Sequence, residues 1–208
     1  MSGLNLQRWV ELWQAATNRD SPANSYDRLV AMYSEPHRSY HNLSHIGDSL
    51  HEFDAARQLA REPVAVELAI WFHDAIYDPH AADNEERSAA LAGDWLRKSG
   101  AASALVASVG QLILATKSHE ARLHADAPLL VDVDLSILGQ PPERFWEYER
   151  QIREEYAWVA PEQFATKRAD ILQTFLARPR IYHTQIFRQK LEAQARINLD
   201  ASIRQLRG

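Results

Sequence analysis

The sequence contains no cysteine, and this absence restricts the chemistry available to the chain. Disulfide bonds and thiolate metal sites are excluded, so a bound metal ion would need histidine, aspartate or glutamate ligands. Residues 1–8 lack the apolar stretch of a signal peptide. No run of apolar residues approaches the ~20 that a membrane-spanning helix needs. We therefore expect a soluble cytoplasmic protein that contacts no membrane.

Positive charge is also in short supply, because the net charge is −5 over 208 residues. A net negative chain is a poor candidate for binding nucleic acid polymers. The segment 166–208 is the exception, with nine Lys or Arg against three Asp or Glu. This basic segment could supply cations to an anionic ligand or form a solvated helix face. The sequence leaves the oligomeric state open.

Glycine is scarce, with seven residues, while the hydrophobic fraction is 46% and includes six tryptophans. Apolar residues recur at helical spacing between short breaks at proline, glycine and capping residues. Besides one central helix that begins at Pro63, the predicted helices span about 6–16, 22–33, 45–60, 85–98, 101–116, 132–139, 142–158, 161–176 and 182–206. The pattern predicts one all-α domain, residues 1–208, of about nine or ten helices.

The central helix carries the most informative stretch of the chain. From Val64 to Phe72 only Glu67 interrupts a run of apolar residues, which predicts a helix buried on most sides. His73 and Asp74 follow side by side in its expected last turn, before Asp78 and Pro79 end the helix. Because an unpaired buried carboxylate is costly, Asp74 needs a partner. A divalent cation could serve both residues, and the alternative is a His–Asp hydrogen-bonded pair without a metal.

Further candidate ligands come from other apolar-flanked segments. They are His45 and one of Asp132 or Asp134. Two imidazoles and two carboxylates suit Mn, Fe, Ni, Co or Zn better than Ca, and Mg is also admitted. The segment 129–139 could be a short strand, but we favour a helix that begins near Asp132, with Asp132 as its cap. In the same way, the spacing of Asp83 and Glu86 predicts a capping box.

His45, then His73-Asp74, then Asp134 resembles the H…HD…D signature of the HD-domain metal-dependent phosphohydrolase superfamily. The stretches 38–45 and 73–79 look like a bacterial branch known mainly as predicted HD phosphohydrolases. The resemblance covers roughly residues 37–140 as a motif core and leaves helices in 141–208 to pack on it. It implies an all-helical fold with His45, His73, Asp74 and Asp134 as metal ligands, and it favours Asp134 over Asp132.

Some residues around this signature depart from the family's better-known members. Alarmone hydrolases of the superfamily carry a Glu-Asp pair soon after the HD dipeptide, where this chain has Tyr77-Asp78. Two-metal members carry extra histidines, for which His41 and His119 are candidates. His41 and His45 also form an H-x-x-x-H pair. The zinc-protease motif needs glutamate after its first histidine, and Asn42 stands there, so protease chemistry is rejected.

The predicted function is hydrolysis of a phosphate ester or anhydride of a nucleotide or similar small metabolite by metal-activated water. Asp78 or His119 would orient the water or protonate the leaving group. Arg38, His41 and Lys117 would contact the substrate, since Arg and Lys bind phosphate. Two alternatives stay open at this stage. One is alarmone or nucleoside-triphosphate hydrolysis, and the other is a non-catalytic metal- or nucleotide-binding sensor.

Overall fold

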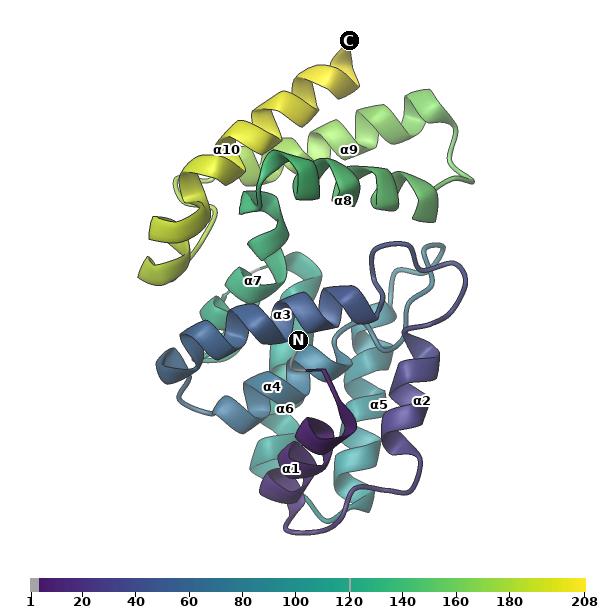
Figure 1. Ribbon diagram of the computed structural model, residues 1–208, viewed down its shortest axis with the longest axis vertical. Coiled ribbons are helices and arrows are strands. Elements are labelled where there is room, and N and C mark those ends of the chain that lie inside the picture. Colours follow the sequence, from purple (N-terminus) through teal and green to yellow (C-terminus); the bar gives the residue numbers. More distant parts are fainter. Residues whose placement is uncertain (1–3, 120) are drawn as a thin grey trace. The chain divides into compact units, whose positions relative to one another are not determined.

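The computed structural model describes residues 4–119 and 121–208, and within these ranges the regular structure is entirely helical. The all-α prediction of about nine or ten helices is therefore confirmed. The elements are α1 (Leu6–Thr17), α2 (Ser25–Met32), α3 (Leu43–Ala56), η1 (Arg57–Leu59), α4 (Pro63–Phe72), α5 (Asn84–Lys98), α6 (Ser103–Ser118), α7 (Ala127–Asp134), η2 (Leu135–Gly139), α8 (Pro142–Glu155), α9 (Pro161–Leu176) and α10 (Gln185–Arg207) (Figure 1).

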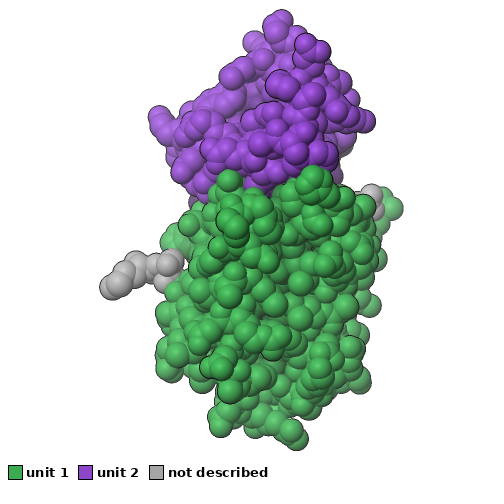
Figure 2. Space-filling view, turned by 90° about the vertical axis from the view of Figure 1, so that its right-hand side faces the viewer, with its two compact units in different colours: residues 1–133 green, residues 134–208 purple. Residues whose placement is uncertain are grey.

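The chain divides into two compact units, residues 1–133 and residues 134–208 (Figure 2). This division lies close to residue 140, where the motif core was expected to give way to C-terminal helices. A single domain over residues 1–208 stays a prediction. Among the helices that the structure describes, none combines the length and apolar character needed to cross a bilayer.

The first unit is built around α4, which packs against α1, α3, α5 and α6 (Figure 1). Pro63 occupies the first turn of α4, where its missing N–H costs nothing. Every residue from Ala65 to Phe72 is buried, as the apolar run predicts. Trp71 and Phe72 lie within 5.4 and 5.9 Å of the ring centroid of Trp9 on α1. The helix that leads into the His-Asp dipeptide is thus anchored on several sides.

Glu67, the one charged residue in that apolar run, is buried, and it pairs with two arginines that are only partly buried. Its Oε1 atom accepts a hydrogen bond of 2.6 Å from Nε of Arg8, and its Oε2 atom pairs with Arg57. Arg8 also donates to both carboxylate oxygens of Asp54, at 2.7 Å each. A buried carboxylate is tolerated when it is paired and hydrogen-bonded in this way. The network ties α1, α3 and α4 together near the middle of α4.

The second unit packs around α10, which contacts α9 and η2. Side chains of the C-terminal segment bind the backbone of η2 directly. The Tyr182 hydroxyl donates to the Leu135 carbonyl at 3.0 Å, and Asn198 Nδ2 donates to the carbonyls of Leu138 and Gln140 at 2.9 Å each. The backbone that follows Asp134 is therefore held by residues from the last quarter of the chain.

Gly139 is required where η2 meets α10. A Cβ atom built there would lie 2.5 Å from Leu191 Cβ and 2.8 Å from the Leu191 carbonyl oxygen. We expect Gly139→Ala to lower the free energy of unfolding by about 1–3 kcal/mol, because the backbone of α10 must move. Gly110 in α6 is the matched control, since a Cβ there would meet nothing within 4 Å. Gly110→Ala should raise that free energy by about 0.5–1 kcal/mol. Urea denaturation measures the free energy of unfolding of both variants. If the two substitutions changed it equally and in the same direction, the packing argument would be contradicted.

Several predicted boundaries are wrong, each for a local reason. The second helix begins at Ser25 after Asn24 in the left-handed region, so Ser21 and Pro22 do not open it. Asp83 occupies the cap position of α5 but makes no side-chain capping bond, so the predicted capping box is absent. Helix α6 continues to Ser118 and thereby includes Lys117, which was expected in a loop.

The most consequential boundary is that of α7. This helix begins at Ala127, so Asp132 lies inside it and does not cap it. The predicted cap is therefore wrong, and so is the alternative of a short strand at this position. The helix that was expected to run to Gly139 instead tightens into η2 after Asp134. The apolar side chains of Leu129 and Leu130 are buried, which explains why the helix extends further toward the N-terminus than its polar residues suggested.

Candidate metal centre

His45 is placed by the start of α3. Asn42 caps this helix, and its side-chain oxygen accepts the N–H of Ser44 at 2.8 Å. The Asn42 side chain also donates to the Ser39 carbonyl at 2.7 Å, which fixes the loop before the helix. His45 then lies in the first turn and is 3% exposed. A local capping sequence thus directs an imidazole into the interior of the first unit.

His73 and Asp74 are placed by the end of α4. The helix ends at Phe72, before the dipeptide, although it was expected to include His73 and Asp74 and to end at Asp78 and Pro79. His73 is the capping residue and Asp74 lies in the turn that follows. Each of the last four carbonyl groups of α4 accepts a hydrogen bond. The donors, in order, are the His73 N–H, the His73 ring, the Tyr33 hydroxyl and the Ala75 N–H. The turn is therefore fully hydrogen-bonded on its helix side.

Three side chains from these two segments converge on one point. His45 Nε2 lies 3.1 Å from His73 Nε2 and 3.6 Å from Asp74 Oδ2, and His73 Nε2 lies 3.1 Å from the same carboxylate oxygen. Ligands held about 2.1 Å from one ion are separated by about 3.0–3.5 Å in octahedral or tetrahedral geometry. The two separations of 3.1 Å fall in that range, and the third, at 3.6 Å, is slightly longer. The donor set therefore fits a single divalent cation.

The hydrogen bond on the far side of the His73 ring sets its tautomer. Nδ1 lies 3.0 Å from the Ile70 carbonyl, which can only accept, so Nδ1 carries the proton. In the neutral ring, Nε2 then presents a lone pair toward His45 and Asp74. Metal-binding histidines are commonly oriented by such a bond to a backbone carbonyl. The alternative without a metal, a His–Asp hydrogen-bonded pair, would need a proton on His73 Nε2 as well, since that atom lies 3.1 Å from Asp74 Oδ2.

Electrostatics favour the ionised form of Asp74. Burial alone would raise the pKa of this carboxyl, but the neighbouring His73, and to a smaller degree His41 and His45, lower its pKa well below the usual range. The carboxylate therefore stays negative at neutral pH, which is the form that binds a cation. A buried anion between two imidazoles is an arrangement that a divalent ion compensates well.

His41 borders this group without belonging to the three converging side chains. Its ring stacks on Tyr77 at a centroid distance of 4.3 Å and lies edge-on to His45 at 6.1 Å. His119 is the capping residue of α6, in the left-handed region with φ of 50°. Among the described residues, the cluster of possible metal ligands consists of His45, His73 and Asp74. Metal contact by His41 or His119 stays a prediction.

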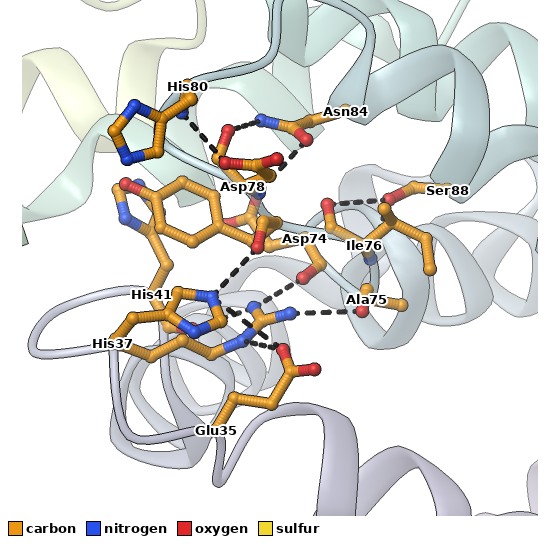
Figure 3. Close-up of polar contacts among 12 residues, drawn as sticks. Glu35, His37, His41, Asp74, Ala75, Ile76, Asp78, His80, Asn84 and Ser88 are labelled. Carbon is orange, nitrogen blue, oxygen red and sulfur yellow. Dashed lines mark hydrogen bonds and ion pairs between the residues drawn. The ribbon is translucent and has the colours of Figure 1, made fainter.

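Asp78 lies in the loop that follows the dipeptide, and it is exposed. Its Oδ1 atom accepts the N–H of His80 at 2.9 Å (Figure 3). The side chain of Asn84 hydrogen-bonds to both backbone groups of Asp78. Its oxygen accepts the Asp78 N–H at 3.1 Å, and its nitrogen donates to the Asp78 carbonyl at 2.9 Å. Ser88, one turn further along α5, accepts the N–H of Ile76 at 3.0 Å. The loop that presents Asp78 is thus held by the first turns of α5.

Sequence reasoning missed Asn84 and Ser88 as supports of this loop. Their four-residue spacing places both on one face of α5, which is a signal that the sequence does contain. The interpretation of the region as a capping box used Asp83 and Glu86 instead and overlooked this face. The actual cap position carries Asp83, whereas Asn84 reaches back to the loop.

Arg38 lies beneath the loop, and its side chain has no exposed surface. Its guanidinium donates to the backbone carbonyls of Asp74 at 2.7 Å, His41 at 3.0 Å and Ala75 at 3.1 Å. Its Nε atom donates to Glu35 at 3.0 Å. A guanidinium that is enclosed in this way offers no face to a ligand from solvent. The structure therefore favours a supporting role for Arg38 over the predicted contact with substrate.

Lys117, by contrast, is at the surface. It donates to the Ala82 carbonyl at 2.7 Å and to Glu86 at 2.5 Å, which raises the pKa of the lysine and lowers the pKa of Glu86. This pair links the end of α6 to the start of α5. Asp134, the predicted fourth ligand, is the first residue of the second unit and is half-buried. Its coordination, like the substrate contact of Lys117, stays a prediction.

No protein-family model, curated protein or solved structure matches this chain. Its function is therefore inferred from the residues themselves and from their geometry.

Proposed function

We propose that this chain is a metal-dependent phosphohydrolase that acts on a phosphate ester or anhydride of a nucleotide or similar small metabolite. The observation that carries the proposal is the convergence of His45, His73 and Asp74, whose ligand atoms all lie within 4.8 Å of one another. The order of these residues along the chain supports it, because they resemble the H…HD…D signature. Neither support identifies the substrate.

The ligand set suits the proposed chemistry. His45, His73 and Asp74 would hold the ion, and Asp134 would complete a set of two imidazoles and two carboxylates. Such a set suits Mn, Fe, Co, Ni or Zn and leaves positions for water and substrate. A bound divalent cation lowers the pKa of its water and polarises a phosphoryl oxygen. A carboxyl group is ordinarily ionised at neutral pH, so Asp74 offers the anionic form that this role needs.

Two groups outside the ligand set are proposed to act on the reacting molecules. His41 borders the cluster, and histidine is the most common general acid or base in enzymes. Asp78 presents an exposed carboxylate from a loop that Asn84 and Ser88 hold in place. We propose His41 and Asp78 as the groups that orient water or protonate the leaving oxygen. His119 is a weaker candidate, since it lies at the end of α6 outside the converging cluster.

Lys117 is the proposed contact for the negative charge of the substrate. We expect Lys117→Ala to raise KM for a phosphorylated substrate at least about threefold while the metal content stays unchanged, because one nearby cation is lost. Lys98, an exposed lysine on α5 that pairs with Asp94 at 2.6 Å, is the matched control. Lys98→Ala should leave KM unchanged. If both variants behave as the parent protein does, Lys117 serves only its ion pair with Glu86.

The proposal is tested by metal analysis followed by a screen for phosphate release. The protein is stripped with a chelator, reloaded with Mn²⁺, Co²⁺, Ni²⁺ or Zn²⁺, and analysed for bound metal. We expect about one ion per chain, and loaded protein should release phosphate or pyrophosphate from at least one member of a nucleotide panel. Less than a few tenths of an ion per folded chain would contradict the metal centre. Full loading without turnover would instead favour the metal-binding sensor.

A further inference from the structure

The side chain of Arg38 joins two backbone segments that carry residues of the candidate metal centre or border it, one at His41 and one at Asp74 and Ala75. Its Nη1 atom donates to the carbonyls of His41 and Asp74, and its Nη2 atom donates to the carbonyl of Ala75. Its Nε atom donates to Glu35. Three of these four acceptors are backbone oxygens, and one of them belongs to Asp74, a member of the converging cluster.

These acceptors lie where a helix end leaves carbonyl groups to be satisfied. The last carbonyls of α4 itself have donors within the turn and from Tyr33, and the carbonyls of Asp74 and Ala75, two and three residues past the helix end, accept from Arg38. A permanent positive charge is also favourable near the C-terminal end of a helix. Only arginine offers five N–H donors in a fixed planar fork, so lysine could not make the same set of bonds.

Two aromatic rings also restrict the position of the Arg38 guanidinium group. The guanidinium carbon lies 5.2 Å from the ring centroid of Tyr33 and 5.4 Å from that of Tyr77. Glu35, which is exposed, pairs with its Nε atom, so the charge of this enclosed cation is compensated by a neighbouring carboxylate. With its side chain enclosed and its donors engaged, Arg38 acts on the site only through the backbone that it holds.

We infer that Arg38 is a positioning residue, which fixes the Asp74 peptide so that the Asp74 carboxylate faces His73 and His45. The inference rests on the proposed function for its consequence in metal binding, but not for its structural content. If the Asp74 peptide rotates, the 3.1 and 3.6 Å separations from the carboxylate to the two imidazoles are lost together. The bond to the His41 carbonyl gives the same residue control over the loop that carries His41.

The chain offers a matched control for this idea in Arg153. That arginine also closes a loop by donating to two backbone carbonyls, of Tyr156 at 2.6 Å and of Val159 at 3.0 Å, and it lies over the ring of Phe164 at 4.7 Å. It belongs to the second unit, outside the candidate centre. Arg38→Lys and Arg153→Lys therefore make the same chemical change, and only the first change alters the Asp74 peptide.

The first readout needs no metal. Hydrogen exchange reports on the amides of Ala75 and Ile76, which donate to the Phe72 carbonyl at 3.0 Å and to Ser88 Oγ at 3.0 Å. In metal-free Arg38→Lys, we expect these two amides to exchange at least about tenfold faster, because the peptides beside them lose their donor. Arg153→Lys should leave both rates unchanged. Unchanged rates in Arg38→Lys would overturn the inference.

The second readout is metal binding, measured by titration with Co²⁺ and by the visible absorption spectrum of the bound ion. Groups that support metal ligands typically change affinity by about 10–100-fold when they are replaced. We expect a loss in that range for Arg38→Lys, with an altered spectrum, and neither change for Arg153→Lys. A parent protein that binds no Co²⁺ would contradict the proposed function, while faster exchange at Ala75 and Ile76 in Arg38→Lys would still support the positioning role.

Arg38→Met, which removes every donor, extends the series. If it keeps cooperative unfolding, its exchange and metal-binding defects should exceed those of Arg38→Lys. If it does not fold, the lysine variant still carries the test. If both Arg38 variants lose cooperative unfolding at 25 °C, Arg38 is a determinant of folding and the positioning role is overturned.

Discussion

Asp74→Ala is expected to remove both metal binding and phosphatase activity. The substitution takes away the only carboxylate among the three converging side chains, and with it the charge that compensates the ion. We expect metal affinity to fall by at least about 100-fold, more than the loss of a supporting residue would cause. Phosphate release by the metal-treated variant should fall below detection. Isothermal titration with Mn²⁺ and a phosphate assay measure the two effects.

The control for this variant is Asp94→Ala, which removes an exposed aspartate from α5. It should bind metal and release phosphate as the parent protein does. The helical circular dichroism of metal-free Asp74→Ala should also be preserved, because the core residues of α4 stay in place. Turnover at the parent rate in Asp74→Ala would show that the converging cluster is not the catalytic centre.

The sequence predicted the framework of this centre because its signals are local and strong. A run of apolar residues interrupted only by Glu67 indicates a buried helix without any knowledge of its neighbours, and α4 has that character. His73 and Asp74 come next, so their place at the end of a buried helix follows from the same run. The convergence of His45 with them agrees with the expected ligand set. The metal itself stays a prediction.

The supports of the centre could not be predicted in the same way, since they depend on contacts between distant segments. Arg38 lies near His41 in the sequence, which suggested a phosphate contact, but its main acceptors are the carbonyls of Asp74 and Ala75. Nothing in a sequence states that an arginine will be enclosed. The same holds for Asn84, whose partner is the backbone of Asp78.

Glu67 is a residue for which the sequence reveals an anomaly but not its cause. From sequence, it is an unexplained charge inside an apolar run. In the structure, it pairs with Arg8 on α1 and with Arg57, and it is 4% exposed. Pairing across 59 residues of sequence leaves no periodic trace, so pattern analysis finds the anomaly without its explanation. A polar residue that breaks a strong pattern is therefore a good place to expect a long-range partner.

The placement of Asp132 failed for a related reason. Its acidic side chain resembles a helix cap, and the apolar residues before it resemble a strand. Burial of Leu129, Leu130 and Val131 overrides both signals, because a helix that begins at Ala127 covers these side chains. Asp132 is consequently inside α7 and has no exposed surface, whereas Asp134 is half-buried. The two aspartates thus occupy different environments despite their proximity in sequence.

This difference leads to opposite expectations for two matched substitutions. Asp132 and Asp134 are two residues apart on α7, so their side chains point about 200° apart around the helix and only one can face an ion. We expect Asp134→Asn to weaken metal binding by at least about 100-fold, because it removes a charged ligand. The melting temperature of the metal-free variant should stay within a few degrees of the parent's. Titration with Mn²⁺ and thermal denaturation of metal-free protein measure the two properties.

Asp132→Asn should instead lower the stability of the protein and largely keep its metal binding. The amide matches the carboxylate in size but exchanges an acceptor for a donor at a site with no solvent, which typically costs about 1–3 kcal/mol. The metal-free protein should therefore melt several degrees lower, while the affinity for Mn²⁺ stays within about threefold of the parent's, since no ligand is lost. If Asp132→Asn removes the ion and Asp134→Asn keeps it, the assignment of Asp134 is wrong. If both variants lose it, both carboxylates serve the centre, and a site with two metal ions becomes the better description.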